Sequence, residues 1–163
     1  MALFYLDTSA LVKRYRSEQG SDFLAELLDN PPANDRFYLS FLSVLELTSG
    51  LLRLAKAGQI SDELAREALS TYRSDLRELL RLWPLGENIF VSAIDVVEQH
   101  RIRSADAIHL ATVLAVSQAE PETELVLVSS DRELVQATQD AGLTVVNPED
   151  AGAGKSLARL REM

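Results

Sequence analysis

The sequence contains no cysteine and only two histidines in 163 residues. Without cysteine the chain can form no disulfide and offers no thiolate ligand to a metal. No apolar stretch approaches the roughly 18 residues of a membrane span. The apolar start, Met1 to Leu6, lacks the charged segment of a signal peptide and is too short for one. These absences lead us to expect a cytoplasmic protein with no membrane contact.

Positive charge is also scarce. The chain has 16 lysines and arginines against 25 acidic residues, which gives a formal net charge of −9. This excess argues against nonspecific binding of a polyanion, because a phosphate backbone favours basic surfaces. Carboxylates that converge on metal ions would raise the acid count without making the outer surface repel nucleic acid.

The sequence is rich in short apolar runs separated by helical patterns. The runs are continuous rather than alternating, as in parallel strands that are covered on both faces; they are Leu3–Leu6, Phe37–Leu39, Leu125–Val128 and Leu143–Val146. Spacing and capping residues predict helices after Thr8–Ser9, at Asp22–Leu28, at Val44–Ala57, from Ser61 to about Leu82, and at Glu87–His100, Ala105–Ser117 and Arg132–Ala141. We therefore predict one α/β domain with a mainly parallel sheet and helices on both faces.

Two aspartates follow predicted strands. Asp7 ends the first strand, and Asp131 comes after the strand segment LVLVSS. In open α/β sheets, ligands bind outside the carboxyl ends of the strands. Both aspartates also precede helices, whose first N–H groups can hold a carboxylate. Helix capping and chemistry both remain open as explanations for these residues.

Two further acids lie in apolar surroundings. Glu46 is flanked by Leu45 and Leu47, and Asp106 lies in the apolar helix SADAIHLATVLA. An unpaired carboxylate in such surroundings costs several kcal/mol or changes its pKa, although a first-turn acid is also favoured by the helix dipole. A divalent cation shared by the four carboxylates would remove the cost. Oxygen ligands alone indicate Mg²⁺ or Mn²⁺ rather than zinc.

Other charged and polar residues have less specific interpretations. Lys13, Arg14 and Arg16 lie close to Asp7 in the sequence and are candidates for phosphate contact. His109 follows Asp106 by three residues and therefore lies near it on the helix. A histidine in an apolar helix is more often packed and hydrogen-bonded than a general base, and we favour that interpretation.

Four segments resemble the PIN domain family and, within it, the VapC-type toxins of bacterial toxin–antitoxin pairs. They are YLDTSALVKRY, SFLSVLELTSGLLRL, IRSADAIHLATVLA and LVLVSSDRELVQATQDAGLTVVNP. Each alone is a weak match, but the ordered set spans residues 3–148 and is specific. We expect a PIN-like nuclease domain over residues 1–148 and a tail over 149–163 that is flexible or forms a short helix.

The resemblance implies a three-layer α/β/α fold and a metal-dependent endoribonuclease that cleaves RNA with a metal-activated water. It also implies a homodimer, and inhibition by a small antitoxin protein whose tail reaches toward the acidic site. The catalytic residues, which would also bind Mg²⁺ or Mn²⁺, are Asp7, Glu46, Asp106 and Asp131, and the supporting hydroxyls are Thr8 or Ser9 and Ser129.

Two other hypotheses stay open. Asp7 could be the nucleophile of a phosphate-ester transfer through an aspartyl-phosphate; that chemistry often has a second aspartate two residues later, where this chain has Ser9. Alternatively, the domain is catalytically silent and binds a protein or an RNA. The acidic residues speak against this last hypothesis.

Overall fold

The computed structural model describes residues 2–162 and shows, within that range, a sheet of five parallel strands. The strands are β1 (Leu3–Leu6), β2 (Arg36–Ser40), β3 (Leu80–Trp83), β4 (Leu125–Val128) and β5 (Thr144–Val146). The helices of the same range are α1 (Thr8–Tyr15), α2 (Ser21–Leu28), α3 (Phe41–Lys56), α4 (Asp62–Glu78), α5 (Glu87–His100), α6 (Ser104–Ala119), α7 (Arg132–Asp140) and α8 (Ala153–Glu162).

The first strand lies in the middle of the sheet. The strand order is β3-β2-β1-β4-β5, and Leu3 of β1 pairs with Arg36 of β2 on one side and with Leu125 of β4 on the other. The chain therefore builds outward from β1 to β3, then crosses back to add β4 and β5. The carboxyl ends of β1 and β4 flank the point where this direction reverses, which is where open α/β sheets bind ligands.

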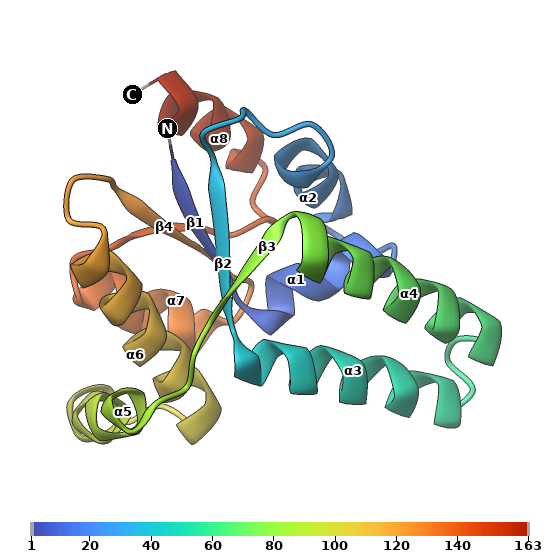
Figure 1. The fold of residues 1–163 in the computed structure, drawn as a ribbon, viewed down its shortest axis with the longest axis horizontal. Coiled ribbons are helices and arrows are strands. Elements are labelled where there is room, and N and C mark those ends of the chain that lie inside the picture. Colours follow the sequence, from blue (N-terminus) through green and yellow to red (C-terminus); the bar gives the residue numbers. More distant parts are fainter. Residues whose placement is uncertain (1, 163) are drawn as a thin grey trace.

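Helices cover both faces of the sheet and complete three layers (Figure 1). Side chains alternate along β1, so Phe4 and Leu6 enter one core whereas Leu3 and Tyr5 enter the other. The first core also contains residues of α1, α2, α3, α4 and α8, and the second contains residues of α5, α6 and α7. Burial of β1 on both faces explains its unbroken apolar sequence. The predicted α/β/α architecture is confirmed.

The sequence-based boundaries differ from the structure by more than two residues at two places. The helix predicted to run from Ser61 to Leu82 ends at Glu78, and Leu80–Trp83 forms the edge strand β3. Leu80 pairs with Phe37 of β2 and is buried, so tertiary pairing overrides the helical spacing. The third helix begins at Phe41 rather than Val44, because the Ser40 hydroxyl at the end of β2 accepts the Ser43 N–H and caps the helix.

The C-terminal residues contain a helix. The helix α8 buries Ala153 and Leu157 in the first core, and Arg161 binds Asp35 in the segment before β2. Within residues 2–162, none of the helices combines the length and the apolar character needed to cross a membrane.

Candidate active site

Asp7 lies at the junction between β1 and α1. Its backbone N–H donates to the Val128 carbonyl of the neighbouring strand β4, 3.2 Å away, which fixes the junction. Its side-chain Oδ1 accepts the Ala10 N–H at 3.0 Å, and the Ser9 hydroxyl donates to the same carboxylate. The side chain is buried, and burial raises the pKa of Asp7 more than these hydrogen bonds lower it. Asp7 is therefore a helix cap with a destabilised charge.

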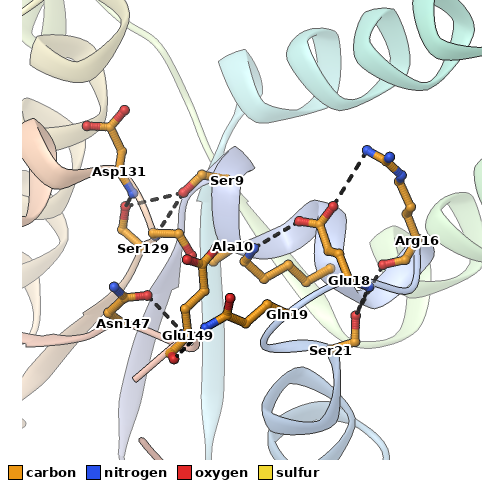
Figure 2. A network of polar contacts seen from close by, with 12 residues as sticks. Ser9, Ala10, Arg16, Glu18, Gln19, Ser21, Ser129, Asp131, Asn147 and Glu149 are labelled. Carbon is orange, nitrogen blue, oxygen red and sulfur yellow. Dashed lines mark hydrogen bonds and ion pairs between the residues drawn. The ribbon is translucent and has the colours of Figure 1, made fainter. Parts of the chain in front are cut away.

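Asp131 occupies the corresponding place after β4, at the start of α7. Its Oδ1 accepts the N–H groups of Glu133 and Leu134 at 2.9 and 3.1 Å, and its own N–H donates to the Ser129 hydroxyl. Ser9 lies between the two junctions, because its hydroxyl accepts the Ser130 N–H at 2.9 Å while it donates to Asp7. Figure 2 shows Ser9 beside Ser129 and Asp131. The predicted supporting hydroxyls of Ser9 and Ser129 therefore join the two strand ends.

Glu46 approaches the same place from the second turn of α3. The Thr8 hydroxyl donates to its Oε2, and His109 Nε2 lies 2.9 Å from the same oxygen. Burial acts to raise the pKa of Glu46, but the hydrogen bonds from His109 and Thr8 outweigh it and the pKa lies below its usual value. Glu46 is thus held as a carboxylate.

Asp106 lies in the first turn of α6 and shares an arginine with Asp131. Arg103 Nε lies 3.0 Å from Asp106 Oδ2, and Arg103 Nη2 lies 2.8 Å from Asp131 Oδ2. Burial and the nearby charge of Asp131 raise the pKa of Asp106 despite this arginine. The Arg103 side chain is 69% exposed, so its guanidinium reaches the carboxylates from the rim of the site.

The structure brings all four predicted carboxylates to one pocket of about 580 Å³. The predicted hydroxyls of Thr8 and Ser9 line it, together with Arg103, Ser104, Ala105 and His109. Ser129 stands behind Ser9, with 3.4 Å between their hydroxyl oxygens. A larger groove of about 970 Å³ shares Thr8, Ser9 and Glu46 with the pocket and continues between α1 and α3 to Arg53 and Lys56.

The pocket fits a hard divalent cation by the chemistry of its donors. Its ligands are carboxylate oxygens, which Mg²⁺ and Mn²⁺ prefer, and the cationic Arg103 already bridges Asp106 and Asp131. In residues 2–162, no group of three or more His, Asp or Glu side chains has the arrangement of a formed metal site. The role of the four carboxylates as metal ligands therefore stays a prediction.

The sequence did not reveal which partners the basic residues in α1 and directly after it have. Lys13 is buried, with its Nζ 2.7 Å from Glu149 and 2.9 Å from Glu18; Figure 2 labels these two glutamates. Arg14 pairs with two aspartates, and Arg16 lies 3.6 Å from Glu18. The interpretation of Lys13 as a phosphate contact is wrong, because its ammonium group is buried and is paired with Glu149, which lies 136 residues away in the sequence. No local pattern could have indicated that pairing.

Arg103 is a site residue that sequence reasoning did not single out, and His109 is one to which it assigned only a structural role. Arg103 had one signal, its place three residues before Asp106, but its second contact with Asp131 depends on the fold. His109 is packed and hydrogen-bonded as predicted, and it also contacts one of the predicted acids, Glu46.

The fold and the site together define an α/β domain with an acidic pocket at the switch point of a parallel sheet, a suitable place for phosphoester chemistry with a divalent cation. Comparison with known families gives the particular one: the model of the PIN domain matches residues 4–139, and the chain belongs to this family. This finding confirms the resemblance seen in the sequence.

Individual relatives agree with that assignment. The chain is 32% identical over 151 residues to ribonuclease VapC35 of Mycobacterium tuberculosis (strain ATCC 25618 / H37Rv). The aligned region covers 91% of this chain and 99% of the relative. It is 30% identical over 145 residues to ribonuclease VapC45 of Mycobacterium tuberculosis (strain CDC 1551 / Oshkosh), with 89% and 95% covered.

Solved structures share the fold. FitAcB from Neisseria gonorrhoeae superposes with a TM-score of 0.61 at 20% identity, covering 89% of this chain and 97% of that one. DNA-bound VapBC from Salmonella typhimurium gives a TM-score of 0.60 at 14% identity, covering 91% and 99%.

Proposed function

We propose that this protein is a Mg²⁺- or Mn²⁺-dependent endoribonuclease, the toxin of a VapBC-type toxin–antitoxin pair, which cleaves RNA in the cytoplasm. The observation that carries the proposal is the convergence of Asp7, Glu46, Asp106 and Asp131 in one pocket of a PIN-domain chain. Relatives at 30–32% identity that carry the name ribonuclease support it.

The four carboxylates would hold the cation, and the rest of the site would hold the carboxylates. A divalent cation at such a site supplies a Lewis acid and lowers the pKa of a bound water. Asp131 is anchored through Oδ1 by amides of α7, which leaves Oδ2 directed to Arg103. Glu46 is anchored through Oε2 by Thr8 and His109. Rigid anchoring of this kind keeps the ligands in place for in-line attack on a phosphodiester.

An antitoxin segment would occupy the groove between α1 and α3. The groove begins at Glu46 in the acidic pocket and is lined by the apolar side chains of Val12, Leu47 and Leu54. A partner segment seated there would bury apolar surface and could extend into the acidic pocket. A segment that covered Thr8, Ser9 and Glu46, which the groove and the acidic pocket share, would exclude RNA and inhibit cleavage.

A homodimer would form through the outer face of α5. Phe90, Val91, Ile94 and Val97 are exposed apolar side chains of this helix, at spacings that place them on one side. Contiguous apolar surface of this kind marks an interaction site. A second copy of the chain would cover it.

The deciding experiment compares wild type with Asp7→Asn, each purified free of any partner and incubated with labelled total RNA plus Mg²⁺, Mn²⁺ or EDTA. We expect discrete cleavage products from wild type with either metal and none with EDTA. The variant keeps the helix cap, because asparagine also caps helices, but it removes the charge. It should therefore fold and leave the RNA intact.

Other outcomes would favour other functions. A folded, partner-free wild type that cuts no RNA with any metal would support the silent binding domain. Equal cleavage by Asp7→Asn would indicate a contaminating nuclease and remove the support for this site. Growth arrest on expression of wild type, absent for Asp7→Asn, would test the role as a toxin.

A further inference from the structure

His109 is buried at the floor of the acidic pocket, between two side chains from other elements. Its Nδ1 lies 2.9 Å from the Tyr5 hydroxyl of β1, and its Nε2 lies 2.9 Å from Glu46 Oε2 of α3. The Tyr5 and His109 rings also meet edge to face, with centroids 6.0 Å apart. A buried chain of hydrogen bonds thus runs from the middle strand of the sheet to Glu46.

The chemistry of the partners fixes the direction of this chain. A carboxylate only accepts hydrogen bonds, so His109 Nε2 must carry a hydrogen and donate it to Glu46. A tyrosine hydroxyl can donate as well as accept, so the Tyr5 hydroxyl, 2.9 Å from Nδ1, can donate to that nitrogen while Nε2 carries the hydrogen. Donation by Tyr5 thereby favours the tautomer in which Nε2 is the donor to Glu46.

Glu46 needs such a donor more than Asp7 and Asp131 do. Asp7 and Asp131 are caps, and free N–H groups at the starts of α1 and α7 hold them. Glu46 lies inside α3, where backbone N–H groups serve the helix itself, and its longer side chain has more rotamers to lose. Among residues 2–162, the hydrogen bonds to its side chain come from Thr8 and His109, and both end on Oε2.

We propose that His109 is a positioning residue that, itself oriented by Tyr5, fixes Glu46 so that its second oxygen, Oε1, is presented to a divalent cation. This inference rests on the proposed function, because it assumes that the acidic pocket binds such a cation. It assigns no proton transfer to His109. The hydrogen-bonded partners of a metal ligand commonly change metal affinity by roughly 10- to 100-fold when they are removed.

The test is a matched pair of variants, His109→Gln and His109→Asn. The glutamine amide can take the place of Nε2 and still donate to Glu46, whereas the shorter asparagine amide takes the place of Nδ1 and reaches only Tyr5. Both variants lose the ring and its packing, so the loss of stability is common to them. Affinity for Mn²⁺, measured by calorimetry on the folded proteins, isolates the bond to Glu46.

We expect His109→Gln to keep most of the wild-type Mn²⁺ affinity and His109→Asn to lose roughly 10-fold or more. Equal affinity of the two variants, or weaker binding by His109→Gln, would overturn the inference while the metal site stands. If wild type itself binds no Mn²⁺, the proposed function fails and the inference fails with it.

Tyr5→Phe provides a second test that leaves His109 and Glu46 in place. Without the Tyr5 hydroxyl, His109 loses the hydrogen bond that orients its ring from β1 but keeps its bond to Glu46, so we expect weaker Mn²⁺ binding than in wild type but stronger binding than in His109→Asn. This variant decides the matter if neither His109 variant folds. Unchanged Mn²⁺ affinity in a folded Tyr5→Phe protein would contradict the proposed orientation by Tyr5.

Discussion

At the scale of single residues, Asp131 uses its two carboxylate oxygens for different partners. Oδ1 accepts N–H groups at the start of α7, and Oδ2 faces Arg103 across the pocket. Capping and chemistry, which the sequence left as alternatives, are therefore compatible in one side chain. Asp7 combines the same cap geometry with deeper burial, which makes its negative charge costly to the fold.

This cost gives a prediction for Asp7→Asn in the absence of metal. The raised pKa of Asp7 means that the folded state binds a proton more readily than the unfolded state does. Stability from this group is therefore present at low pH and is lost as pH rises from the usual value of 3.8 through the folded pKa. The variant lacks the charge, so its stability advantage over wild type should grow from acid toward neutral pH in urea titrations.

Asp7→Ala is the control for the cap. It removes the same charge but also the acceptor for the Ala10 N–H, so it should be less stable than Asp7→Asn by about 0.5–2 kcal/mol. A stability difference between wild type and Asp7→Asn that stays constant with pH would contradict the raised pKa.

For Arg103 we predict that removal of the side chain raises the affinity for a divalent cation. Its guanidinium bridges Asp106 and Asp131 from an exposed position and so competes with any cation for their oxygens. Arg103→Gln should bind Mn²⁺ more tightly, roughly two- to tenfold, and the gain should shrink at high salt because the pairs are screened. Calorimetry at two salt concentrations measures it. Weaker Mn²⁺ binding by the variant would mean that Arg103 organises the carboxylates instead.

At the scale of elements, the predictable part of the fold is the part that is buried. The strands β1 and β4 are covered on both faces and stand out as apolar runs, and the acids after them follow from the rule on strand ends. The strand β3 lies at the sheet edge, and its sequence LRLW continues the helical spacing of α4. Only pairing with β2 makes it a strand, and that pairing is not visible locally.

The same distinction holds for the site. The four acids were identifiable because each is unusual where it stands, at a strand end or in an apolar helix. Their partners were not, because the bond from Arg103 to Asp131 spans 28 residues and that from His109 to Glu46 spans 63. Contacts over such separations depend on how α3, α6 and α7 converge at the sheet.

A prediction for α3 concerns Gly50, inside the helix on the wall of the groove. A Cβ added at Gly50 would meet no atom within 4 Å, so Gly50→Ala should stabilise the protein by about 0.5–1 kcal/mol through lower chain entropy. Urea unfolding measures this, and RNA cleavage should be unchanged. If Gly50→Ala were instead destabilised, the groove would have less room beside Gly50 than its volume of about 970 Å³ indicates.

At the scale of the whole molecule, the α5 face predicts the oligomeric state. Ile94 is 58% exposed and central among Phe90, Val91 and Val97. Ile94→Arg would place a charge in the middle of the proposed interface, and sedimentation should change from dimer to monomer. Arg66→Ala, on the exposed surface of α4, is the control and should remain dimeric. A monomeric wild type, or a dimeric Ile94→Arg protein, would refute this interface.

The last prediction joins the acidic pocket to the net charge of −9. A cation that binds only the folded chain stabilises it by mass action, by about 2.7 kcal/mol at a free concentration one hundred times its Kd. Thermal unfolding of wild type should therefore shift upward continuously with Mn²⁺ and return on addition of EDTA. Any salt also screens the repulsion within an acidic chain, so each Mn²⁺ concentration needs a NaCl control of equal ionic strength.

Asp7→Asn is the control variant, because it keeps nearly the same net charge but loses a ligand. It should respond like wild type to NaCl and much less to Mn²⁺. If wild type and variant shift equally in Mn²⁺, the effect is screening of the whole molecule and the pocket is not its source.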